Sequence, residues 1–347
     1  MVPGRPSAPF ALCNASKNSA RLTFLAAVCA VVEGATTVAP EPCTNAVAAV
    51  LNDSPRRVCV LGGRADMPRS LGSVYAGSVV RFLGGCRGVP SRVIETGVAS
   101  WNNTMALTHD GTMLLAVNIS IDVDITRPAI TVIRVADGDV VRRVGTHGTG
   151  PLQFRCPRQV CVAVDEHVFI ADCDNDRVQV LTPTLEFHSF LGADQLVSPV
   201  GVCADDTFVG VSEFHRHRIS VFARRDGALL HRFGDGQLAG PLGLCFVAKS
   251  GAIAVADVLN RRVLVFTVGG TFVRRVGAGV LSRPLSVACS DGGTEIVVAD
   301  NERSLVAVFD VDGELLRTLG CGNFSCVTVH DGAIYAHTTH GACTVFT

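Results

Sequence analysis

The chain of 347 residues is poor in aromatic side chains and carries almost no net charge. Aromatic residues make up 6% of it, with one tryptophan and two tyrosines, so it offers few platforms on which single-stranded nucleic acid bases could stack. Lysine and arginine number 30 against 31 acidic residues, and this balance gives no overall field that would attract nucleic acid or an anionic membrane. An electrostatic partner would therefore have to be bound by a local patch of charge.

The sequence also lacks the common motifs of catalytic and metal sites. It has no G-x-S-x-G, no phosphate-binding loop and no H-E-x-x-H. Its 14 cysteines include no C-x-x-C pair, so we expect most of them to be reduced and buried. No residue is indicated as a nucleophile. We therefore expect no metal and no cofactor, and we favour a binding protein over an enzyme.

No hydrophobic run near the amino terminus is long enough to cross a bilayer. The apolar run at residues 22–32 follows Lys17 and Arg21 and has the length of a signal-peptide core, but Glu33 follows it at once. We expect a short helix there, within an extension of residues 1–72 that is helical or partly disordered. The corresponding prediction is a cytoplasmic protein without a membrane span, with the secretory route as the less favoured alternative.

An internal repeat is the strongest positive signal in the chain. Four successive segments place an acidic residue before an alternating apolar strand, and in three of them an arginine follows the acid by five positions. A valine of the following strand recurs at Val180, Val221, Val265 and Val308, in steps of 41, 44 and 43 residues. A β-rich repeat with this period is typical of a propeller. The segments are ADCDNDRVQVL from Ala171, EFHRHRISVF from Glu213, ADVLNRRVLVF from Ala256 and ADNERSLVAVF from Ala299.

Glycine and proline divide each repeat into strands. Glycine supplies a positive φ where the chain leaves a strand, and proline suits the first position of the next strand, where its missing N–H costs no ladder bond. The terminal glycines are Gly145, Gly192, Gly234, Gly277 and Gly320, and the prolines are Pro157, Pro199, Pro241 and Pro284. This pattern predicts an all-β fold, a six-bladed β-propeller over residues 73–347.

The last repeat ends after three strands, so an amino-terminal strand has to complete it. Residues 78–84, SVVRFLG, have the alternation and terminal glycine of a fourth strand. We predict that this segment pairs with the last strand, ACTVFT, because such pairing closes the ring and removes an open sheet edge.

Residues 78–347 resemble the NHL repeat family, whose six-bladed propellers have a proline-led first strand, an AD-x-x-N-x-R-V hairpin and a terminal glycine. ADCDNDRV and ADVLNRRV match this hairpin, whereas Glu213 replaces the aspartate in the third blade and Leu305 replaces the arginine in the fifth. In the sixth blade we align His337 and Ala342 with the two charged positions. The resemblance implies the propeller fold and a ligand that differs among members: a protein, single-stranded RNA, or a small substrate in enzyme branches.

NHL propellers are often attached to RING-type ubiquitin ligase modules. The resemblance therefore implies a role in recruiting substrates for a ubiquitin ligase partner. This chain lacks the Cys/His spacing of such a module, so any ligase activity would come from that partner.

The spacing of acid and arginine has a direct physical interpretation. A four-residue turn places the two side chains opposite each other across a hairpin, where such a pair contributes about 0.2–1 kcal/mol. We interpret Asp172–Arg177, Glu213–Arg218 and Asp257–Arg262 as structural pairs, with Asp300 as a fourth acid. The alternative is that this ring of acids binds a partner or a cation.

The turns that follow these acids differ from repeat to repeat and should form one face together with the glycine–proline crossovers. Unlike loops on a rigid frame are where specificity usually lies, so we expect a protein partner to bind this face of a monomeric propeller. The candidate binding residues are His215, Arg216, His217, Arg218, Asn260, Arg261, Glu302, Arg303 and His340.

Two other functions remain open. Single-stranded RNA could bind through Arg216, Arg218 and Arg261, whereas DNA binding is not expected. A metal-dependent lyase or lactonase would need ligands at the channel mouth, and the candidates are His215, His217, His337 and His340. Cysteines at one shared position of the innermost strand could bind a soft metal, but we favour small apolar packing residues. These are Cys161, Cys203 and Cys245, with Cys326 as a possible fourth.

Overall fold

The computed structural model describes residues 47–51, 58–62, 81–83, 90–96, 104–118, 129–247, 250–320 and 322–347. The chain divides into two compact units, Met1–Gly85 and Cys86–Thr347. In the first unit β1 (Val47–Leu51) pairs antiparallel with β2 (Val58–Gly62), and β3 (Arg81–Leu83) runs parallel to β2. The described residues of the extension, predicted as helical or partly disordered, include the strands β1 and β2, while the apolar run at residues 22–32 lies outside the described residues.

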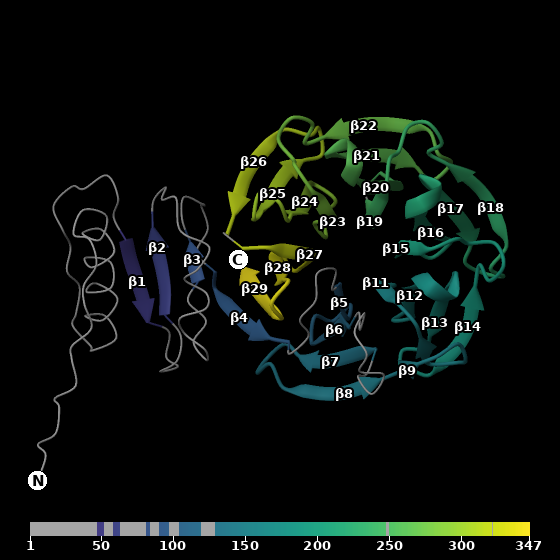
Figure 1. The fold of residues 1–347 in the computed structure, drawn as a ribbon, viewed down its shortest axis with the longest axis horizontal. Coiled ribbons are helices and arrows are strands. Elements are labelled where there is room, and N and C mark those ends of the chain that lie inside the picture. Colours follow the sequence, from purple (N-terminus) through teal and green to yellow (C-terminus); the bar gives the residue numbers. More distant parts are fainter. Residues whose placement is uncertain are drawn as a thin grey trace, which may run out of the picture. The chain divides into compact units, whose positions relative to one another are not determined.

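The second unit is a six-bladed β-propeller (Figure 1). The innermost strands β5, β11, β15, β19, β23 and β27 surround the centre, and each blade runs outward from one of them. The first three blades are β5 (Met105–Leu107), β6 (Met113–Val117), β7 (Ile130–Arg134), β8 (Val140–Val144); β11 (Pro157–Val162), β12 (Val168–Asp172), β13 (Arg177–Leu181), β14 (Phe187–Leu191); and β15 (Pro199–Ala204), β16 (Phe208–Glu213), β17 (Arg218–Ala223), β18 (Leu229–Phe233).

The remaining three blades follow the same plan, except that the last one takes its outer strand from earlier in the chain. They are β19 (Pro241–Val247), β20 (Ala252–Asp257), β21 (Arg262–Thr267), β22 (Phe272–Val276); β23 (Pro284–Cys289), β24 (Glu295–Asp300), β25 (Leu305–Asp310), β26 (Leu315–Leu319); and β27 (Phe324–His330), β28 (Ala333–Thr338), β29 (Ala342–Phe346) with β4 (Arg92–Glu95). A short parallel pair, β9 (Thr146–His147) and β10 (Gln153–Phe154), lies between the first and second blades.

The ring is closed by an amino-terminal strand, but residues 78–84 do not supply it. β4 pairs antiparallel with β29, with Val93 opposite Thr344 and Ile94 opposite Cys343. Ile94 is buried in a cluster shared with the first blade, and this packing favours β4 as the closing strand. Our prediction that residues 78–84 pair with the last strand was therefore wrong. The strand in that segment, β3, pairs with β2 in the first unit.

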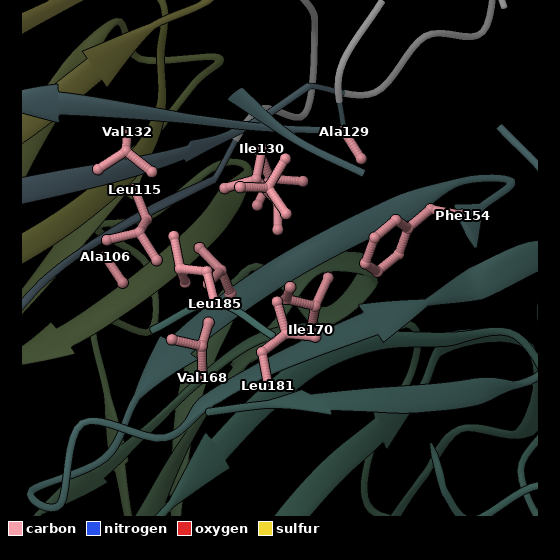
Figure 2. Close-up of a cluster of buried hydrophobic side chains, with 13 residues drawn as sticks. Ala106, Leu115, Ala129, Ile130, Val132, Phe154, Val168, Ile170, Leu181 and Leu185 are labelled. Carbon is pink, nitrogen blue, oxygen red and sulfur yellow. The ribbon is translucent and has the colours of Figure 1, made fainter. Parts of the chain in front are cut away.

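The hydrophobic core lies between neighbouring blades. Figure 2 shows one such layer, in which Leu115 and Ile130 of the first blade face Ile170 and Leu181 of the second. All four side chains are almost fully buried, and each contributes about 1.5–3 kcal/mol through removal of apolar surface from water. The outermost strands alternate instead, as in β14, because one of their faces meets solvent.

The glycines and prolines occupy the places that the sequence indicates. The five terminal glycines have φ values between 62° and 103°, and the four prolines begin β11, β15, β19 and β23. At Gly277 an added Cβ would lie 2.4 Å from Leu281 Cδ1, so a larger residue would displace the buried Leu281 in addition to straining the backbone.

Candidate functional site

The acids that end the second strands join two parts of the fold. Asp172 is fully buried; its Oδ2 receives hydrogen bonds from Arg177 Nε (3.2 Å) and Asn175 Nδ2 (2.7 Å). Its Oδ1 accepts the N–H of Arg155, which belongs to the crossover from the preceding blade (3.0 Å). One carboxylate therefore holds its own hairpin and the incoming chain together.

The same arrangement recurs in the next two blades. Glu213 bonds Arg218 through both oxygens, at 2.9 and 3.0 Å, and accepts the crossover N–H of Val197 (2.9 Å). Asp257 bonds Arg262 Nε (2.8 Å) and the crossover N–H of Ala239 (2.7 Å). The longer side chain of Glu213 thus fills the role of aspartate without changing the plan.

The fifth blade shows what happens when the arginine is missing. Leu305 stands opposite Asp300, and this acid accepts backbone N–H groups from Ser282 (2.6 Å), Arg283 (2.9 Å) and Arg303 (3.2 Å) instead. All four acids are fully buried and already hydrogen-bonded. Their geometry favours the structural interpretation over a ring of acids open to a ligand, and removing one of them would leave buried donors unsatisfied.

The last residue of each turn forms a second layer of contacts between blades. Asp176, His217, Arg261 and Ser304 occupy the same position and have φ values from 51° to 56°, a conformation that costs residues other than glycine about 1–2 kcal/mol. Three of these side chains bond the crossover that leads into the following blade: Asp176 accepts Ser198 N–H (2.6 Å), His217 Nδ1 accepts Gly240 N–H (2.9 Å), and Ser304 donates to Asn323 Oδ1 (2.8 Å).

Arg261 differs from the other three. It has the same left-handed backbone (φ 56°) and is exposed, and within the described residues its guanidinium forms no hydrogen bond or ion pair. The neighbouring Arg262, not Arg261, is the partner of Asp257. The left-handed backbone at Arg261 therefore costs free energy that no described contact of its side chain offsets.

An apolar spot lies beside Arg261. Leu259 is 60% exposed, and an added Cβ at Gly240 would lie 3.0 Å from Leu259 Cγ and 2.8 Å from Phe214 Cε2. The side chains of Leu259 and Phe214 therefore meet over the same crossover glycine, although they come from the fourth and third blades. His215 contacts the Phe214 ring edge-on at 5.1 Å between centroids.

The structure thus divides the candidate binding residues into two groups. His217, Arg218 and Asn260 are used within the fold, the last through a 2.9 Å bond to Asp257. The other candidates are exposed in turns on the same face: His215, Arg216, Arg261, Glu302, Arg303 and His340. Our sequence analysis missed Phe214 and Leu259. Leu259 could have been found, because the neighbouring repeats carry the polar His215 and Glu302 at the same turn position, but Phe214 stands where Cys173 and Val258 are also apolar.

The sixth blade departs from our alignment by one position. Phe324 pairs with Thr338, where the other blades pair a strand residue with the acid, so Thr338 rather than His337 stands at the acidic position. The turn is one residue shorter, and Thr338 Oγ1 accepts the Ala342 N–H (3.3 Å). His337 is fully buried within β28, so the proposed set of four turn histidines around a shared metal was wrong.

His337 instead belongs to the ring closure. Thr96 Oγ1 donates to the Gly341 carbonyl (2.9 Å), so the 2.9 Å contact between His337 Nε2 and Thr96 Oγ1 is donated by the histidine. Burial lowers the pKa of His337 to about 4, which keeps the imidazole neutral at pH 7. Its Nδ1 has no hydrogen-bond partner among the described residues.

The cysteine series is shorter than we expected. Cys161, Cys203 and Cys245 share one register position, but Cys326 lies two positions away, opposite His337, and Thr328 takes the equivalent place. Burial raises the pKa of Cys161 to about 11 and raises that of Cys203 and Cys245 as well. In the part of the chain that the structure describes, no three histidine, cysteine or acidic side chains are placed to hold a metal ion.

No protein-family model and no curated protein matches this chain. Among the described residues there is also no helix with the length and apolar character needed to cross a membrane. The fold is therefore shown by the structure itself, and the NHL resemblance stays a prediction.

Proposed function

We propose that this propeller is a protein-interaction scaffold that binds an acidic partner segment over the third- and fourth-blade turns. The observation that carries the proposal is that the exposed Leu259 lies beside Phe214, and that the same two turns carry the exposed Arg261 and Arg216 two residues further on. Aromatic side chains and arginine are enriched in protein interfaces, and this surface combines the half-buried Phe214 with the exposed Arg216 and Arg261. A partner with an apolar side chain among acidic residues would cover Leu259 and pair with the two arginines.

The backbone at Arg261 adds to this proposal. A glycine at this position would remove the cost of the left-handed conformation, and the sixth blade does place Gly341 (φ 86°) in its equivalent turn. An arginine that is strained and makes no described internal contact is expected where its side chain is needed for binding.

Affinity capture from a cell extract tests the proposal with matched variants. Leu259→Ser and Arg261→Ser alter the proposed surface, while Val164→Ser is the control because Val164 is 61% exposed in a turn on the opposite face. We expect one set of proteins to be captured by the wild type and by Val164→Ser and to be lost from both other variants. Full retention by Leu259→Ser would contradict the proposed surface.

A labelled single-stranded RNA separates this proposal from the RNA alternative. Arg216 and Arg261 are shared by both, but Leu259 offers an RNA chain no charge and no stacking platform. RNA binding that survives Leu259→Ser and weakens in Arg261→Ser would favour the alternative. Recruitment of the captured protein to a ubiquitin ligase rests on the NHL resemblance, and ubiquitination of that protein in the presence and absence of this chain tests it.

A further inference from the structure

The centre of the propeller contains a cavity of about 260 Å³ lined by the innermost strands of all six blades. Its lining runs from Gln159, at mid-depth, to His330 at the end of β27 and to His109 and Asp291 in turns between first and second strands. These turns lie on the face opposite the Leu259 surface. His109 and Asp291 are exposed, so the cavity opens on that face.

The other end of the cavity is closed by one side chain. Gln159 of β11 donates to the Leu244 carbonyl (2.7 Å) and accepts the Leu244 N–H (3.0 Å), although β15 lies between β11 and β19 in the ring. Two glycines let the strands approach closely at this level: an added Cβ would lie 2.2 Å from the Leu242 carbonyl oxygen at Gly201 and 2.8 Å from Ser286 Cα at Gly243. The cavity is therefore a blind cup, and both polar groups of Gln159 are already satisfied.

The wall of the cup is neutral. Its side chains are mostly aliphatic residues and thiols, among them Cys161, Cys203 and Cys245, and its polar groups, such as Thr328 and the strand backbones, are uncharged. Because burial raises the pKa of each of these thiols, they carry no charge at pH 7. An apolar cavity of about 150 Å³ is sufficient for benzene, so this cup has room for an apolar group of at least one aromatic ring.

The turns around the mouth of the cup carry acidic residues, and one of them, Asp291, lines the cavity itself. Turns of five blades carry carboxylates: Asp110, Glu166, Asp206, Asp291 and Asp331. Asp165 is paired with Arg224, which also lies 3.7 Å from Asp206. Hydrogen bonds from Thr108 and Thr112 lower the pKa of Asp110, so this carboxylate stays ionised at neutral pH. The ring of His330 lies against Gly111, where an added Cβ would be 2.2 Å from Nε2, so the first- and sixth-blade turns meet at the rim.

We propose that the cup binds a small organic cation, with an apolar group of about one aromatic ring inside and an ammonium group among the rim carboxylates. Charge complementarity selects this ligand class. An anion of the same shape would meet the carboxylates of Asp291 and Asp331, and a charge inserted deeply would find no counter-charge in the neutral wall. The site is independent of the proposed protein-binding surface.

The test uses the full chain and four probes: 2-phenylethylammonium, 2-phenylethanol, phenylacetate and ethylammonium. Calorimetry measures binding, and mass spectrometry follows alkylation of Cys161, Cys203 and Cys245 at alkaline pH, since a ligand in the cup should shield these thiols. We expect phenylethylammonium to bind and to slow alkylation, the alcohol to do so more weakly, and the other two probes to have no effect. Equal protection by phenylacetate, or none by phenylethylammonium, would overturn the proposal.

Two sets of variants identify the binding groups. In the double variant Asp291→Asn, Asp331→Asn we expect binding of phenylethylammonium to weaken about three- to tenfold at low salt, since exposed charge pairs are modest. Asp235→Asn, on the opposite face, is the control and should bind as the wild type does, as should Leu259→Ser. Ala288→Phe fills the cup and should abolish binding. Unchanged affinity in the double variant would contradict the role of the rim, whether or not Ala288→Phe folds.

Discussion

At the scale of single residues, His337 connects protonation to stability. Its pKa is about 4 in the folded chain, because burial disfavours the charged ring, against 6.5 for an ordinary histidine. As the pH falls, His337 therefore binds a proton in the unfolded chain before it does so in the folded chain. The stability that the neutral ring provides is present above pH 6.5 and is lost between pH 6.5 and about 4.

We predict that this histidine accounts for a loss of about 2–3 kcal/mol in the free energy of unfolding between neutral and mildly acidic pH. His337→Gln keeps a donor for Thr96 and removes the titration, so its stability should fall less over the same range. Urea unfolding of both proteins at several pH values measures the difference. Parallel pH profiles would show that His337 does not titrate as its burial implies.

The contacts of single residues could be predicted from the sequence only in part. The spacing of Asp172 and Arg177 indicated a hairpin pair, and the structure joins them. The sequence could not show that Asp172 also accepts the N–H of Arg155, because that contact depends on the path of the crossover from the preceding blade. For the same reason it could not distinguish Arg261, whose guanidinium makes no described hydrogen bond or ion pair, from His217, whose ring bonds Gly240.

At the scale of secondary-structure elements, the turn after the second strand ends in a left-handed residue in the second to sixth blades. Replacing Arg261 by glycine relieves that backbone and breaks no described contact, although glycine also costs entropy on folding. We predict that Arg261→Gly raises the free energy of unfolding by about 0.5–1 kcal/mol. Thermal unfolding measures this, and the same variant should lose the captured partner.

The control is Asp176→Gly, in which the same relief is offset by loss of the acceptor for Ser198 N–H. We expect this variant to gain no stability. If Asp176→Gly were stabilised as much as Arg261→Gly, the contacts between turns and crossovers would contribute nothing, and the distinction drawn for Arg261 would fail.

The order of strands was largely predictable, because alternation, terminal glycines and leading prolines are local signals. The closing strand was not. Residues 78–84 and 92–95 both alternate, and the choice between them depends on which one buries an apolar residue against the first blade. Ile94 does so beside Met105 and Leu107, a long-range contact that no local pattern reports.

At the scale of the whole molecule, one ring holds two different faces. One carries the Leu259 surface and the other carries the mouth of the cup, and Gln159 separates them along the axis. Both depend on a closed propeller, because the sixth blade contributes His330 to the cup and His340 to the opposite face. The central claim is therefore that β4 closes the ring.

An engineered cross-link in the full chain tests this claim most directly. Val93 and Thr344 are opposite each other across β4 and β29, where Cβ atoms lie about 4.5–5.5 Å apart, close enough for a disulfide after modest adjustment. Mild oxidation of Val93→Cys, Thr344→Cys should give a disulfide between these positions, identified by mass spectrometry of peptides, with a propeller that melts at a higher temperature. A cross-link that forms instead in Phe82→Cys, Thr344→Cys, and not in the first pair, would contradict closure by β4.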